Sequence, residues 1–233
     1  MNESKSKNDR GGDPPSPLRS TRILLIEDHP LMRQAVKETL EQERDFVICG
    51  EADNEVNAMQ LFKSTQPHLV LLDLSLGDSS GLDLIKWMTK IDPAIRVLVL
   101  SMHDETLYAE RAIRAGARGY LNKRVAPDTI IAAIRSVLAG SIYLNPAIVG
   151  RILQRLAGGS AEAQTADIEK LSDREMETFE LIGAGVGSRE IAARLCVSVK
   201  TIDAYRLRIK EKLGISTSPE LARRAVEWVL SKS

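Results

Sequence analysis

Short apolar runs alternate with apolar residues at helical spacing along the first 140 residues. The run "RILLIED" (22–28) is typical of a buried strand, and the helically spaced apolar positions that follow it begin at Leu31, next to a proline suited to a first helical turn. The same alternation recurs and predicts further strands near residues 46–52, 69–72, 95–101 and 119–123. Five strand–helix units in succession predict a parallel sheet with helices on both faces.

The pattern changes after Gly140. A helix is predicted from Asn145 to Leu156, and the small, polar stretch "AGGSAEAQTAD" is typical of a linker. Only helical spacing follows, with helices expected at 173–183, 188–195, 199–213 and 218–230. The sequence therefore predicts four segments: a disordered tail over 1–20, an α/β domain over 21–140, a linker with a helix over 141–166, and an all-helical domain over 167–233.

Composition adds few constraints to this picture. The 233 residues carry 32 basic and 32 acidic side chains, so the overall charge indicates no particular partner. The two cysteines, Cys49 and Cys196, lack CxxC spacing and fit reduced thiols in a reducing cytosol. No apolar run approaches the roughly 20 residues of a membrane helix, and the N-terminus lacks a signal-peptide core. We therefore expect a cytoplasmic protein with no membrane association.

Polar residues stand at four of the five predicted strand ends. Glu27 and Asp28 follow the first strand, Asp73 the third, Ser101 the fourth and Lys123 the fifth. In an open parallel sheet, ligands bind at these carboxyl ends. Three neighbouring carboxylates repel one another unless a cation such as Mg²⁺ lies between them, and a lysine and a hydroxyl nearby suit a phosphoryl group. Asp73 is then a candidate covalent acceptor.

Each of these residues alone has a simpler interpretation. A lone aspartate or serine at a strand end usually caps the next helix, and a lone lysine is usually a solvated charge. The occurrence of all of them at strand ends of one sheet favours a binding site.

The motifs "LIEDHPLMR", "LVLLDLSL", "LVLSMHD" and "GARGYLNK" resemble the receiver domain of two-component response regulators, over residues 22 to about 140. The resemblance implies a CheY-like, doubly wound fold with strand order 2-1-3-4-5, and phosphorylation of Asp73 by a histidine kinase. It also implies a Mg²⁺ site and phosphoryl contacts. The implied residues are Glu27, Asp28, Asp73 and the backbone carbonyl of Ser75 for Mg²⁺, and Ser101 and Lys123 for the phosphoryl group. Tyr120 is at the position of the family's switch aromatic, although an ordinary strand aromatic is an equal alternative. Gly77 stands where relatives commonly have proline, which predicts a looser loop.

The segment "SREIAARLCVSVKTIDAYRLRIKEKLGI" (188–215) contains a helix, a turn and a longer helix that Ser198 can cap. Ile202, Tyr205, Ile209 and Leu213 share the stripe expected to face a core. The opposite face includes Leu207, which suits apolar contact with a thymine methyl. Over residues 167–233 the 12 basic and 11 acidic residues nearly balance, but over 200–212 there are 5 against 2. Such a stripe alone is more often a solvated face than a nucleic-acid site.

The stretch from Leu171 to Ile215 resembles the LuxR-type helix–turn–helix, with its motif at about 188–207. Together with the receiver, it identifies the chain as similar to response regulators of the NarL/FixJ type. The resemblance implies double-stranded DNA as partner and a homodimer when phosphorylated. The last helix resembles the family's dimer contact, although its apolar stripe equally suits a core. The implied DNA contacts are Lys200, Thr201, Asp203, Ala204, Leu207, Arg208 and Lys210, and the implied dimer contacts are Leu221, Ala225 and Val229.

The sequence predicts a phosphorylation-controlled transcription regulator and not an enzyme. An aspartyl phosphohydrolase usually has a second acid two residues after its nucleophile, where this chain has Ser75. A second alternative is a transcription or interaction protein whose receiver is not phosphorylated, which the intact set of acids disfavours.

Overall fold

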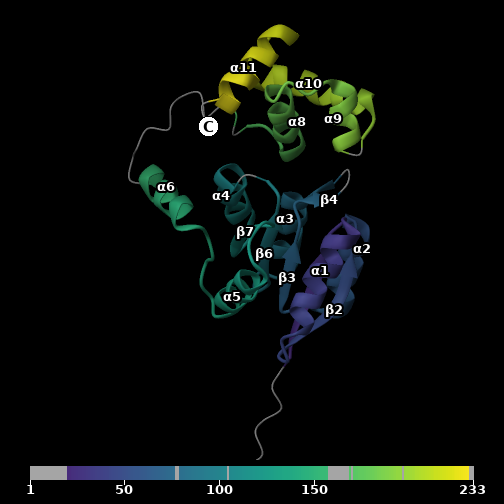
Figure 1. Ribbon diagram of the computed structural model, residues 1–233, viewed down its shortest axis with the longest axis vertical. Coiled ribbons are helices and arrows are strands. Elements are labelled where there is room, and N and C mark those ends of the chain that lie inside the picture. The colour runs from purple at the N-terminus through teal and green to yellow at the C-terminus, as the bar shows by residue number, and fades with distance from the viewer. Residues whose placement is uncertain are drawn as a thin grey trace, which may run out of the picture.

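A computed structural model gives the fold and describes residues 20–76, 79–103, 105–156, 168, 170–195 and 197–230. An α/β part and a helical part follow one another along the long axis of the molecule (Figure 1). Four sequence predictions lie outside the described residues: the tail before Ser20, the loop at Gly77, the linker stretch over 157–167, and the thiol of Cys196. The other cysteine, Cys49, is a free, partly buried thiol.

The α/β part is built on one parallel sheet with strand order β2-β1-β3-β6-β7. These are the five predicted strands in the order 2-1-3-4-5, so the predicted fold class is confirmed. The strands are β1 (Thr21–Ile26), β2 (Phe46–Ala52), β3 (Leu69–Leu72), β6 (Arg96–Ser101) and β7 (Gly119–Asn122).

Helices cover both faces of this sheet (Figure 1). One core joins a face of the sheet to α1 (Pro30–Glu41) and α5 (Pro127–Leu138). The other joins the opposite face to α2 (Glu55–Thr65), α3 (Gly81–Ile91) and α4 (Glu105–Ala115). Because β3 lies between β1 and β6 and is covered on both faces, all four of its residues are buried, which explains its unbroken apolar run.

The sequence analysis did not predict a small hairpin that follows β3. Strands β4 (Ser75–Leu76) and β5 (Ser79–Ser80) pair antiparallel, and two-residue strands are too short to show any period. Ser80 then caps α3. Gly81 approaches the loop that follows β3 so closely that a Cβ there would lie 2.6 Å from the Cα of Leu74. A glycine is therefore needed for α3 to begin against the end of β3.

Over the described residues from 170 on, the helical part contains four helices at the predicted places, and α6 lies before it in the chain. Ser172 and Glu175 form a capping box at the start of α8, and α8 packs against both α10 and α11. No helix in the described ranges is long and apolar enough to cross a membrane. The helices are α6 (Pro146–Leu156), α8 (Asp173–Gly183), α9 (Ser188–Arg194), α10 (Val199–Leu213) and α11 (Ser218–Leu230).

Candidate functional site

The acidic residues predicted to meet at the sheet edge do so in the structure. Strands β1 and β3 are neighbours in register, with Ile26 opposite Leu72. Glu27 and Asp73 therefore leave the sheet side by side, and both are buried, with 2% and 3% of their surface exposed. The backbone N–H of Asp73 donates to the carbonyl of Ile26 at 2.9 Å, which holds Asp73 against the end of β1.

Lys123 bridges the two buried carboxylates. Its Nζ lies 2.6 Å from Glu27 Oε2 and 2.8 Å from Asp73 Oδ2, and its side chain is 4% exposed. Burial raises the pKa of Glu27, and the neighbouring Asp73 carboxylate raises it further, while Lys123 acts in the opposite direction. The single positive charge of Lys123 therefore does not fully compensate the negative charge of the two buried carboxylates.

The donor set fits a divalent cation. Glu27, Asp28, His29 and Asp73 each offer a ligand atom, and these atoms lie within 4.8 Å of one another. Asp73 Oδ1 is buried without a hydrogen-bond partner among the described residues. Three carboxylates gather near the one ammonium group of Lys123, and hard carboxylate oxygens suit Mg²⁺. Of the implied Mg²⁺ ligands, the structure thus brings the three carboxylates together, and it places Ser75 at the start of β4, half-buried.

His29 lies at the rim of this cluster, mostly exposed. Its Nδ1 is 2.7 Å from Asp28 Oδ1, which makes it a neighbour of the acid pair.

Ser101 and Tyr120 lie on the neighbouring strands β6 and β7. Ser101 is fully buried at the end of β6, and its hydroxyl accepts a hydrogen bond from the backbone of His103 at 3.3 Å. Tyr120 is 1% exposed and turned inward, and its hydroxyl donates to the carbonyl of His103 at 3.1 Å. The predicted switch residue is therefore bonded to the loop that follows Ser101.

His103 connects the pocket to the helical part, a connection that sequence reasoning missed. Its Nε2 lies 2.9 Å from Ser75 Oγ and 2.8 Å from Glu177 Oε1 on α8. Burial lowers the pKa of His103, but the Glu177 carboxylate outweighs it, so the pKa is raised overall. Nothing in the sequence indicates this pair, because His103 belongs to the α/β part and Glu177 to the helical part.

The second candidate site is the outward face of α10. The hydroxyl of Ser198 caps this helix by accepting from Thr201 N at 3.1 Å. Ile202 and Ile209 are fully buried, as predicted, whereas Leu207 on the opposite face is 54% exposed. The remaining predicted DNA contacts divide by exposure: Lys200, Asp203 and Arg208 are exposed, and Thr201, Ala204 and Lys210 are half-buried.

The predicted dimer contacts on α11 lie largely in the core of the helical part. Leu221 and Ala225 are completely buried, and Val229 is half-buried. Helix α11 approaches α8 so closely that a Cβ at Gly183 would overlap with the Ala225 backbone and the Val229 side chain. Because buried side chains cannot also face a second protomer, the core alternative describes Leu221 and Ala225. The exposed apolar residues of α11 are Val226 and Leu230.

Comparison with known proteins gives a family for each of the two parts of the chain. Residues 23–135 match the family of the response regulator receiver domain, and residues 169–225 match the bacterial regulatory proteins of the luxR family. The chain is 32% identical to the oxygen regulatory protein NreC of Staphylococcus carnosus over 91% of this chain and 97% of that protein. It is 35% identical to the transcriptional regulatory protein UhpA of Escherichia coli over 87% of this chain and 96% of that protein.

Solved structures show the same likeness. The RcsB response regulator of Salmonella typhimurium matches with a TM-score of 0.54 and 25% identity, over 88% of this chain and 97% of that one. A LuxR-family response regulator from Aurantimonas matches with a TM-score of 0.55 and 30% identity, over 59% of this chain and 99% of that one. These matches define a receiver joined to a DNA-binding module. The chain belongs to the two-component response regulators with a LuxR-type DNA-binding domain, which are transcription regulators and not enzymes.

Proposed function

We propose that Asp73 is the phosphoacceptor of a cytoplasmic response regulator, and that a sensor histidine kinase supplies the phosphoryl group. The observation that carries this proposal is the buried, unpartnered Oδ1 of Asp73. A carboxylate oxygen in this state, beside a lysine and other acids, is suited to react with an electrophilic phosphorus in the presence of a cation.

In the proposed transfer, Asp73 Oδ1 attacks the phosphorus of a phosphohistidine. The P–N bond breaks, its electron pair returns to the kinase imidazole, and Asp73 becomes an acyl phosphate. Lys123 holds the second carboxylate oxygen and partly compensates the added charge. We assign the Ser101 hydroxyl, at the end of the nearby strand β6, as a donor to the phosphoryl group. Mg²⁺ bound by Glu27, Asp28, Asp73 and the carbonyl of Ser75 would supply positive charge to the phosphoryl oxygens.

DNA binding is assigned to α10, with its outward face in a major groove. Lys200 and Thr201 stand at the N-terminal end of the helix, where contacts with phosphates set the position of the protein. Asp203 can accept from a cytosine amino group, and Leu207 can contact a thymine methyl. The exposure of Leu207 supports this assignment, as does the name of UhpA, a transcriptional regulatory protein. We further propose that phosphorylation favours a homodimer, with α11 as one contact.

The test compares the DNA affinity of the wild-type protein with that of Asp73→Ala, each with and without acetyl phosphate and Mg²⁺. Fragments recovered from a genome-wide footprint serve as the DNA. We expect acetyl phosphate to raise the affinity of the wild-type protein only. Equal DNA affinities of the wild-type protein and Asp73→Ala, unchanged by acetyl phosphate, would contradict the phosphorylation switch. They would leave the assignment of DNA binding intact.

A further inference from the structure

The turn after β1 carries two of the three acids of the cation site, Glu27 and Asp28. The backbone N–H of Glu27 donates to the carbonyl of Ala52, the last residue of β2, at 2.9 Å. The Glu27 side chain accepts from the backbone N–H of His29 at 3.1 Å. The neighbouring strand therefore holds one backbone group of Glu27, and the carbonyl of Glu27 is held by a side chain instead.

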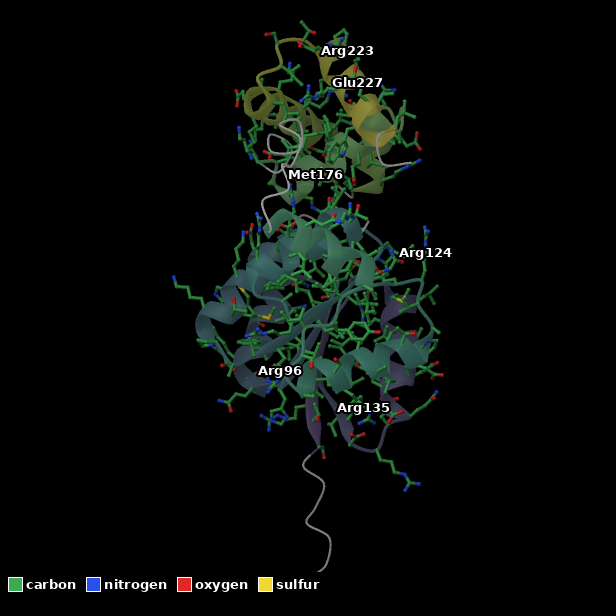
Figure 2. The ribbon with its side chains drawn as sticks, turned by 90° about the vertical axis from the view of Figure 1, so that its left-hand side faces the viewer. Arg96, Arg124, Arg135, Met176, Arg223 and Glu227 are labelled. Atoms are coloured by element: carbon green, nitrogen blue, oxygen red, sulfur yellow. The ribbon has the colours of Figure 1, made fainter. Side chains whose placement is uncertain are left out.

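Arg33, in the first turn of α1, reaches back to this carbonyl. Its Nη1 donates to the carbonyl oxygen of Glu27 at 2.7 Å, and its backbone N–H donates to that of His29 at 3.0 Å. The Arg33 side chain is only 23% exposed. Arginines at the outside of the receiver, such as Arg124 and Arg135 in Figure 2, are exposed instead. Arg33 therefore exchanges water for a charge-assisted hydrogen bond to the acidic turn.

Glu51 on β2 fixes the orientation of the Arg33 guanidinium. Its Oε2 lies 3.8 Å from Arg33 Nε, and its Oε1 lies 2.6 Å from Lys37 Nζ. Because Nε and Nη1 are held in one plane, one orientation of the guanidinium meets both Glu51 and the Glu27 carbonyl. The Glu51 carboxylate also compensates the positive charge of Arg33, which would otherwise oppose a cation bound at the acidic turn. Arg33 can therefore hold the turn at little electrostatic cost to the cation site.

We propose that Arg33 is a positioning residue for the Mg²⁺ site. By holding the Glu27 carbonyl, it fixes the turn from which Glu27 and Asp28 present their carboxylates to the cation. This inference rests on the proposed Mg²⁺ site of the receiver. Arg33 carries a positive charge and is not a ligand itself, so its effect passes through the backbone of the ligands. Loss of Arg33 should weaken Mg²⁺ binding and leave the transfer step unchanged once the site is filled.

The first test is isothermal titration of the unphosphorylated full chain with MgCl₂, for the wild-type protein and Arg33→Gln. We expect the dissociation constant to rise about tenfold, because groups that orient metal ligands commonly have effects of this size. Arg33→Lys keeps the charge, but its single ammonium group cannot meet the Glu27 carbonyl and Glu51 in the geometry of the planar fork. It is expected to recover only part of the affinity.

A second measurement separates positioning from a general loss of structure. The rate of phosphorylation by acetyl phosphate is followed over a series of Mg²⁺ concentrations. Arg33→Gln is expected to need about tenfold more Mg²⁺ for half of its maximal rate, and to reach a maximal rate within about twofold of that of the wild-type protein. A variant that is merely less folded would lose maximal rate and keep the wild-type half-saturating Mg²⁺ concentration. Urea unfolding without Mg²⁺ measures the stability of each variant.

Lys37→Gln is the matched control. Lys37 lies on the same helix and pairs with the same Glu51, its side chain is 30% exposed, and among the described residues its ammonium group has no partner in the acidic turn. It is expected to bind Mg²⁺ as the wild-type protein does.

The outcomes separate the positioning role from the proposals on which it rests. Wild-type Mg²⁺ affinity in Arg33→Gln, or an equal loss in Lys37→Gln, overturns the positioning role and leaves the Mg²⁺ site intact. A wild-type protein that binds no Mg²⁺ overturns the site and the positioning role together. Mg²⁺ binding that depends on Arg33 in a protein whose Asp73 is never phosphorylated overturns the phosphoacceptor assignment alone.

Discussion

The acceptor pocket and the outward face of α10 differ in where their side chains come from and in how far these are buried. The pocket collects single side chains from the ends of separate strands, and those of Glu27, Asp73 and Lys123 are buried and paired with one another. The α10 face takes its side chains from one helix and leaves them exposed. Substitutions in the pocket should therefore affect stability and chemistry together, whereas substitutions on α10 should affect only the binding of a partner.

Removal of Lys123 should produce the largest effect. Lys123→Ala leaves Glu27 and Asp73 buried without their shared positive charge, at a cost of about 3–5 kcal/mol in the free energy of unfolding. Urea unfolding followed by Trp87 fluorescence in a Trp228→Phe background measures this loss. Mg²⁺ should restore part of the stability, because a second cation compensates the same carboxylates.

Lys86 offers the matched control, since its ion pair with Asp83 is exposed. Lys86→Ala should change the free energy of unfolding by less than about 0.5 kcal/mol. A comparable loss in both variants would show that burial does not distinguish the pocket.

Loss of a carboxylate at the cation site should come next. Asp28→Asn keeps the shape of the side chain but weakens the donor set, and we expect phosphorylation by acetyl phosphate to slow by about a hundredfold. Isothermal titration with Mg²⁺ should show weaker binding in the same variant. An unchanged Mg²⁺ affinity would exclude Asp28 from the site.

The sequence predicted the pocket well because the pocket is formed by residues that stand at the ends of parallel strands. Apolar runs in the sequence show where strands end, and parallel strands bring their carboxyl ends to one edge of the sheet. Glu27 and Asp73 could therefore be placed together from the sequence alone. The contact of His103 with Glu177 could not be predicted. It depends on how two independently patterned domains dock, and no periodicity within either one encodes that geometry.

The last helix, α11, shows a second limit of prediction from the sequence. Leu221 and Ala225 lie on an apolar stripe, and such a stripe suits a core and a dimer contact equally well. Only the close packing of α11 on α8 decides between these alternatives. The four helices themselves were predicted nearly to the residue from their apolar spacing, and the cap of α10 at Ser198 is a local signal.

On the α10 face, Arg208→Ala should lower DNA affinity by about tenfold and reduce the salt dependence of binding, since one exposed cation is lost. Fluorescence anisotropy across a salt series measures both quantities. The free energy of unfolding and the phosphorylation rate should match those of the wild-type protein. A large loss of stability would contradict the independence of this face.

Glu175 should give the smallest effect. Burial raises its pKa, but hydrogen bonds from Lys212 and the Ser172 backbone outweigh this, so the pKa lies below its usual value. A lowered pKa stabilises the folded state above the unfolded pKa, and this contribution is lost as pH falls through the folded pKa. Glu175→Gln should therefore cost about 1 kcal/mol at neutral pH.

The difference between Glu175→Gln and the wild-type protein should disappear in acid. Thermal unfolding followed by Trp228 fluorescence in a Trp87→Phe background, at a series of pH values, measures it in the helical domain. A difference that is constant across pH would show that the carboxylate charge is not involved.

The most direct test of the account is to locate the phosphoryl group itself. The full chain is incubated with acetyl phosphate and Mg²⁺, the acyl phosphate is trapped by borohydride reduction, and peptides are mapped by mass spectrometry. The account predicts a single modified residue, Asp73, and no modification in Asp73→Asn or after chelation of Mg²⁺. Modification of another residue while Asp73 stays unmodified would contradict it.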